Sequence, residues 1–210
     1  LRKVIEDNRG MLRSPQVGSA SANSASNPLF DLATQVGEAM GKDHGAIRQA
    51  LTTPDAKAYA RFLDPATTPP GNIYDLGILL VSAVTMSLVK IYELRASQLM
   101  LMATGGSGIL QDGAIEPNLL NQLSSMAADT ANRLLKICIR AIEFTSPIGV
   151  TFSGYLRALL TADYLLSPDE EFHLRRILVE SFAERGIFAS EAGSQDPASV
   201  RFRSQTEQGT

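Results

Sequence analysis

The sequence predicts an all-α fold, a multi-helix orthogonal bundle around a buried central helix at about residues 76–104. An almost unbroken apolar run extends from Leu76 to Val89 without a proline. Apolar residues recur at helical spacing on either side of this run, and no alternating strand pattern occurs. A helix that is apolar on nearly every face lies in a core or in a membrane, and this run is shorter than the roughly 20 residues of a spanning helix. We therefore predict a core helix in a soluble protein.

Length and composition fit one globular domain of 210 residues, with 44% hydrophobic residues and a net charge of −3. The basic residues are scattered, so we expect no nucleic-acid surface, which would need clustered Lys and Arg. The single cysteine, Cys138, excludes an internal disulfide. The first ten residues lack the apolar segment of a signal peptide. We expect no membrane partner, and of the compartments we favour the cytoplasm.

The two ends of the chain are predicted to lie outside the helical domain, which spans residues 27–188. Residues 1–13 are typical of the end of a helix that begins in a missing N-terminal part, with Gly10 as its stop. The small, polar residues 14–26 indicate a flexible loop, and residues 189–210 a disordered tail.

Before the central helix, Asn27 and Pro28 start a helix that Gly41 ends. Two short helical segments and a proline-rich loop, residues 64–72, lead to the central helix. After Val89 the central helix keeps one apolar stripe, formed by Ile91, Leu94, Leu99 and Met102.

Three further helices follow the glycine-rich break at residues 105–108. Pro117 starts an amphipathic helix whose apolar stripe runs to Ile142 and includes Cys138. Thr151 caps the next helix. Ser167, Pro168 and the three carboxylates after them start the last one, which Gly186 closes.

Few side chains carry recognisable chemistry. His44 and His173 have no second His or Cys at metal-ligand spacing, and we interpret both as solvated. The carboxylates at 169–171 are explained by helix capping, and Cys138 by core packing. We predict no metal ligand and no cofactor in this chain.

Four polar side chains are harder to explain by packing alone. Tyr74 and Asp75 directly precede the central helix, where side chains can face a cleft beside the helix dipole. The alternative is that Asp75 only caps that helix. Arg157 is either a surface arginine or part of an internal ion pair, and Asp163 is a candidate anchor for the end of its helix.

Four stretches, residues 29–51, 76–99, 119–144 and 147–188, resemble a group of bacterial zinc-peptidase-like proteins, the gluzincins related to thermolysin. The most specific stretch is PIGVTFSGYLRALLTADYLLSPDEEFHLRRILVESFAERGIF. The resemblance implies that this chain is the C-terminal helical lobe. It implies that the HExxH zinc site lies before residue 1, so that the full-length protein would hold zinc.

In thermolysin-like enzymes a histidine of the helical lobe stabilises the transition-state oxyanion, and the matching position here holds Tyr74. The resemblance makes Tyr74 a candidate oxyanion donor with Asp75 beside it, and assigns Asn72, Arg157 and Asp163 to the substrate cleft. The replacement of that histidine by Tyr74 is equally compatible with an inactive member of this group of proteins. The missing zinc part would be the main partner and a peptide the substrate. Its removal would expose apolar surface on residues 1–11 and on one face of the central helix.

Two functions of different classes follow. The first is the lobe of a zinc metallopeptidase, forming one wall of the substrate cleft and inactive alone because it lacks the metal that activates water. The second is a non-catalytic, all-α protein-interaction module. An HExxH in the reading frame upstream of Leu1 would favour the first, and its absence the second.

Overall fold

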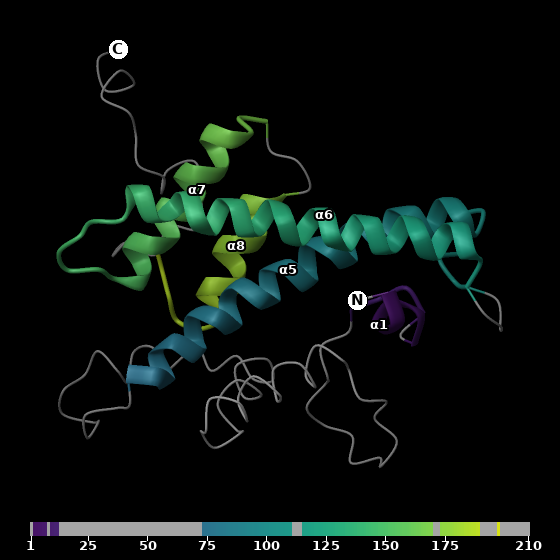
Figure 1. Cartoon of the computed structure of the whole chain (residues 1–210), viewed down its shortest axis with the longest axis horizontal. Helices are drawn as coiled ribbons and strands as arrows, with labels where there is room; N and C mark the ends of the chain where they lie inside the picture. The colour runs from purple at the N-terminus through teal and green to yellow at the C-terminus, as the bar shows by residue number, and fades with distance from the viewer. Residues whose placement is uncertain are drawn as a thin grey trace. The chain divides into compact units, whose positions relative to one another are not determined.

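A computed structural model describes residues 2–7, 9–12, 73–110, 115–169, 173–189 and 197. These segments form helices and turns and contain no strand, which confirms the all-α class for them (Figure 1). None of the described helices combines the length and the hydropathy of a membrane span. The orthogonal arrangement and the likeness to a thermolysin-type lobe stay predictions. The expected helices between residues 27 and 63, the loops at 14–26 and 64–72, and the tail from residue 190 lie outside the described residues.

The chain divides into two compact units, and the boundary falls within helix α6, Pro117–Ala141. The first unit contains α1, Arg2–Asp7, then α5, Ile73–Ala103, and the N-terminal half of α6. Within its described residues, the second contains the C-terminal half of α6 and three further helices. These are the 3-10 helix η1, Ile142–Phe144, then α7, Phe152–Leu166, and α8, Leu174–Ala183.

Helix α5 is the predicted central helix, but it begins three residues earlier than expected. It is not buried on every face, because Val81 is 51% exposed and Met102 is 74% exposed. The stripe that packs into the core of the first unit is formed by Val89, Tyr92, Ala96 and Met100. The expected stripe was wrong at Met102. The prediction selected the largest aliphatic side chains of the helix, whereas the structure buries Tyr92 and Ala96 in the core.

The N-terminal segment packs into this core and contains a tight turn at Gly10. Gly10 follows α1 with a φ of +90°, and its N–H donates to the Ile5 carbonyl at 2.7 Å. The buried Tyr92 hydroxyl donates to the Gly10 carbonyl at 2.7 Å. Ile5 is fully buried. The predicted stop at Gly10 is therefore confirmed, while the expected exposed apolar surface on residues 1–11 is not found at Ile5.

The break after α5 and the start of α6 follow local signals. Gly105, Gly106 and Gly108 all have positive φ, a conformation that side chains disfavour, and they end the helix as predicted. At α6, the Glu116 carboxylate accepts the N–H of Leu119 at 2.8 Å. Backbone hydrogen bonds from Asn118 and Leu119 lower the pKa of Glu116. Helix α6 thus starts at Pro117, as the sequence predicts.

In the second unit, the start of α7 was predicted correctly and the start of α8 was not. Thr151 caps α7, since its hydroxyl accepts the N–H of Gly154 at 3.0 Å. Ser167 does not start a helix: it ends α7, with its N–H bonded to the Asp163 carbonyl at 2.8 Å. Proline is also common just after a helix end, so Ser167 and Pro168 fit both roles. Helix α8 begins only after His173, which is exposed in the left-handed region at φ +52°.

Candidate functional site

The predicted site residues lie in different parts of the chain. Asn72 is outside the described residues. The backbone of Tyr74 and Asp75 forms part of the first turn of α5, so Asp75 lies inside the helix and is not the residue that precedes it. Arg157 and Asp163 lie on α7 in the second unit, six residues apart and therefore on different sides of that helix.

Asp163 is the centre of a buried ion cluster. Its side chain is 1% exposed, and one carboxylate oxygen lies 2.8 Å from Nε of Arg175 on α8. The other oxygen lies 3.3 Å from Nη2 of Arg133 on α6. The cluster joins three helices of the second unit. It confirms that Asp163 anchors the end of its helix, and the assignment of Asp163 to a substrate cleft stays a prediction.

Arg175 extends this cluster to the turn after α7. It donates to the carbonyl of Ser167 and to that of Pro168, the latter at 3.1 Å. Its guanidinium also lies 5.3 Å from the centre of the Tyr164 ring, within cation–π range. All of these contacts fix α8 against the end of α7. The cluster stabilises the fold, because its charges pair with one another inside the protein.

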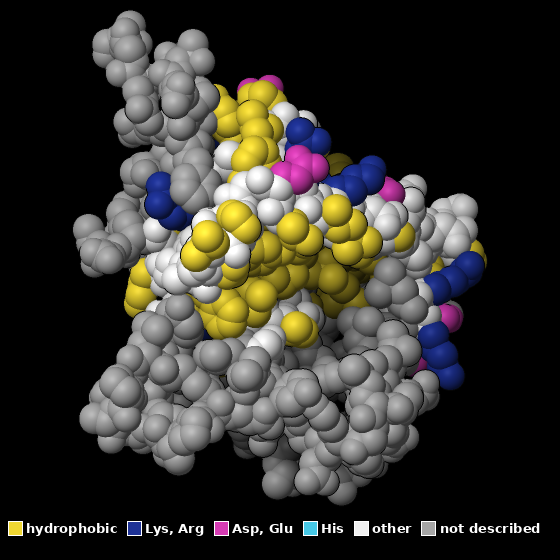
Figure 2. Space-filling model, turned by 60° about the vertical axis from the view of Figure 1, so that its left-hand side comes forward, with side chains coloured by type: hydrophobic (Ala, Val, Ile, Leu, Met, Phe, Trp, Pro, Cys, Tyr) yellow, Lys and Arg dark blue, Asp and Glu magenta, His cyan; other side chains and the backbone are white. Residues whose placement is uncertain are grey.

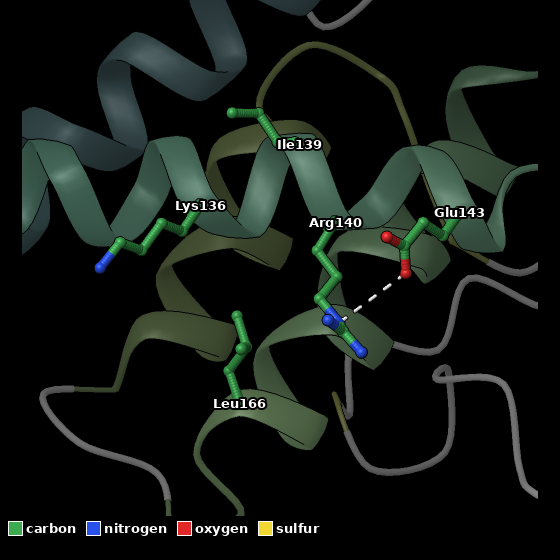
Figure 3. A pocket seen from close by; sticks show the side chains of 5 residues that line it. All are labelled: Lys136, Ile139, Arg140, Glu143 and Leu166. Atoms are coloured by element: carbon green, nitrogen blue, oxygen red, sulfur yellow. Dashed lines mark ion pairs between the residues drawn. The ribbon is translucent and has the colours of Figure 1, made fainter.

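A separate open hollow lies on the surface of the second unit (Figure 3). Its volume is about 280 Å³. It is lined by Lys136, Ile139, Arg140, Glu143 and Leu166. The first three come from α6, Glu143 comes from η1, and Leu166 comes from the last turn of α7. Nε of Arg140 and a carboxylate oxygen of Glu143 lie 3.9 Å apart, and these side chains are 47% and 65% exposed.

An exposed row of apolar side chains runs along α6 and η1 beside this hollow. The row, called here the outer stripe, consists of Leu135, Ile139 and Ile142, which are 57%, 59% and 66% exposed. Ile142 was assigned to the core stripe of α6 in the sequence, and this assignment is wrong. The core side of the same segment is formed by Leu134, Ile137 and Ala141, each 4% exposed or less. Figure 2 shows hydrophobic side chains reaching the surface of the protein on one face.

Sequence reasoning missed the outer stripe because it placed Ile142 in the core row and left Leu135 and Ile139 unassigned. Residues 134, 137 and 141 repeat at helical spacing, and so do residues 135, 139 and 142. Both rows are apolar, and only one can face the core. A pattern search that removed the first row would have left the second as an independent signal.

The remaining chemistry in the described residues is sparse. No group of three or more His, Cys, Asp and Glu side chains within them is arranged to hold a metal ion. Cys138 is partly buried, and burial raises the pKa of its thiol. The Tyr155 hydroxyl donates to the Cys138 carbonyl at 3.1 Å, and burial raises the pKa of this phenol. Both groups are neutral at physiological pH and link α7 to α6.

Comparison of the chain with models of protein families, with curated proteins and with solved structures finds no match. Nothing in these comparisons links the chain to gluzincin peptidases. The outer stripe and the hollow beside it are therefore the candidate functional site that the described residues themselves provide.

Proposed function

We propose that this chain is a helical protein-interaction module, which binds a protein partner through the outer stripe and the adjoining hollow. The single observation that carries the proposal is the row of Leu135, Ile139 and Ile142, each more than half exposed. Isolated exposed apolar residues are ordinary on protein surfaces, whereas contiguous ones indicate a contact surface.

The surroundings of the stripe fit the same function. Lys136, Arg140 and Glu143 form a charged border on one side, and apolar contact surfaces commonly have such polar rims. Leu166 on α7 is 50% exposed and lines the hollow, which widens the apolar area. A partner helix that buries two or three large aliphatic side chains gains roughly 1.5–3 kcal/mol for each of them.

The test is site-specific cross-linking with a photoreactive amino acid at position 139 of the whole chain in its native cells. The control carries the same probe at position 109, since Ile109 is 76% exposed and lies in the first unit, after α5. We expect a discrete protein adduct at 139, identified by mass spectrometry, and none at 109. Absence of a discrete adduct at 139 would refute this function for the outer stripe.

The second proposal is that the chain is the helical lobe of a zinc metallopeptidase. Its support is the resemblance of the four sequence stretches, together with the position of Tyr74 in the first turn of α5. The first amide groups of a helix have no intrahelical partners and favour negative charge, which suits an oxyanion. Zinc, held by a preceding part of the protein, would activate the water.

Two measurements test this second proposal. The reading frame before Leu1 should encode an HExxH helix followed by a helix with a further glutamate. In the active full-length protein, Tyr74→Phe should lower kcat by about 10²–10³-fold, the effect of removing one oxyanion donor, while leaving the fold intact. An unchanged kcat would remove Tyr74 from the mechanism.

A further inference from the structure

We propose that the partner of the outer stripe is a second copy of this chain, with the two segments formed by the end of α6 and by η1 packed antiparallel across a two-fold axis close to Ile139. This inference rests on the proposed function, because it names the partner for the same surface. It follows from the spacing of the apolar residues and from the signs of the charges beside them.

The outer stripe has the spacing of a helix–helix seam. Leu135, Ile139 and Ile142 lie at i, i+4 and i+7, which is the spacing of alternate a and d positions in a coiled coil. The core-facing residues of the same helix lie on the other side, so the stripe points outward. Two such stripes interlock by the usual knobs-into-holes packing and bury one another without changing the fold of either copy.

The charges beside the stripe are self-complementary. Lys136 follows Leu135 directly and Glu143 follows Ile142 directly, so both lie on the same flank of the stripe. The hollow confirms the shared flank, because both residues line it. They are seven residues apart, about 10 Å along a helix, and the midpoint lies between Ile139 and Arg140.

A two-fold axis through this midpoint, perpendicular to α6, sets Lys136 of each copy opposite Glu143 of the other. The contact is isologous, so one pairing occurs twice. The two Ile139 side chains meet near the axis. Arg140 lies farther from the stripe and keeps its contact with Glu143 of its own chain, 3.9 Å away. A carboxylate has enough acceptor sites for both cations.

Other occupants fit the charge pattern less well. In a parallel pair, the flank with Lys136 and Glu143 would face the opposite flank, where Ala131, Cys138 and Thr145 carry no charge. A uniformly acidic helix would meet Glu143 with like charge, and an anionic lipid surface would do the same. The antiparallel copy is the arrangement that pairs both signs.

The test uses charge reversal and mixing in the full chain, with association followed by sedimentation equilibrium over a range of concentrations. We expect Lys136→Glu and Glu143→Lys each to weaken self-association by about tenfold or more, because each creates two like-charge contacts; tenfold corresponds to about 1.4 kcal/mol. The two single variants, mixed, should form a heterodimer in which both contacts pair opposite charges. The double variant should self-associate as well as the original chain.

Two controls separate the effects of charge from effects on folding and from nonspecific hydrophobic association. Circular dichroism should give the same helix content for every variant. Ile139→Asp should abolish association, whereas Ile109→Asp, on an exposed residue of the first unit, should leave it unchanged.

Several results would overturn the inference. A strictly monomeric chain, association that neither single reversal weakens, or single variants that fail to pair on mixing would each do so. If a monomeric chain still gives a cross-link from position 139 to another protein, only the second copy is wrong and the interaction module stands. If the chain is monomeric and position 139 gives no adduct, both proposals fail.

Discussion

The carboxylate of Asp163 shows how one buried residue can hold several helices together. Two arginines from different helices converge on it in a nearly water-free position. Burying an ionised carboxylate is costly unless it is paired and hydrogen-bonded, and Arg175 and Arg133 fulfil both conditions. The three charges hold α6, α7 and α8 in one arrangement.

We expect Asp163→Asn to lower the free energy of unfolding by about 3–5 kcal/mol, because it leaves the largely buried Arg175 without its counter-charge. Urea unfolding measures the change. The matched control is Glu180→Gln, which breaks the pair with Arg176 at 2.8 Å, where the side chains are 42% and 70% exposed. The control should cost at most about 1 kcal/mol. Equal losses in the two variants would contradict the structural role of Asp163.

Two glycines should respond in opposite directions to the same substitution. Gly10 has a φ of +90°, and a Cβ there would lie 3.2 Å from the Leu123 side chain. Gly77 is inside α5, and an added Cβ would meet nothing within 4 Å. We expect Gly10→Ala to destabilise the chain by more than about 1 kcal/mol and Gly77→Ala to stabilise it by about 0.5–1 kcal/mol. Thermal unfolding of both variants checks the signs, and a stabilised Gly10→Ala would refute the tight turn.

At the scale of helices, α6 is stabilised at its start by a carboxylate. Glu116 accepts a backbone N–H from the first turn, which favours its ionised form and lowers its pKa in the folded state. A group with a lowered folded pKa contributes stability above its unfolded pKa, and this contribution is lost as pH falls through the folded pKa. The cap is therefore active at neutral pH and released in acid.

We expect Glu116→Gln to be less stable than the original chain at neutral pH, with a difference that shrinks as the pH falls below the ordinary range of a glutamate. Urea unfolding at a series of pH values measures this. The matched control is Asp129→Asn, which removes an exposed carboxylate farther along α6. A difference that stays constant with pH would show that the ionised cap is not the cause.

At the scale of the whole molecule, one testable property is whether the chain binds a metal ion. It contains two histidines and one cysteine, and the described residues hold no cluster able to bind a metal ion. We expect the purified chain to bind no stoichiometric zinc, and a chelator to leave its midpoint of thermal unfolding unchanged. Elemental analysis that finds one tightly held zinc per chain would contradict this.

Both functional proposals concern surfaces that a partner would cover. In the first unit, Leu101, Met102 and Ile109 are also exposed near the end of α5. The resemblance to a peptidase lobe leads us to expect apolar surface on this helix, while the outer stripe lies on α6 and η1 in the second unit. The cross-linking experiment at positions 139 and 109 compares these two surfaces directly.

The sequence by itself determined the helical class of the described segments and many of their ends. Helix starts and stops act through hydrogen bonds and steric limits within a few residues, so they can be recognised in the sequence. Examples are the starts at Pro117 and Thr151 and the stops at Gly10 and at the glycines after α5. The same local signals misled at Ser167, because a polar residue before proline fits the end of one helix as well as the start of another.

Only the tertiary structure decided which row of apolar residues faces the core. On α5 it selected Tyr92 and Ala96, and on α6 it left Ile139 outside. It also brought Arg133 and Arg175 to Asp163, three residues that are distant in the sequence. A helix of given sequence can turn any apolar stripe inward. The choice depends on the shape and charge of the helices packed against it, and those are contacts that no local pattern contains.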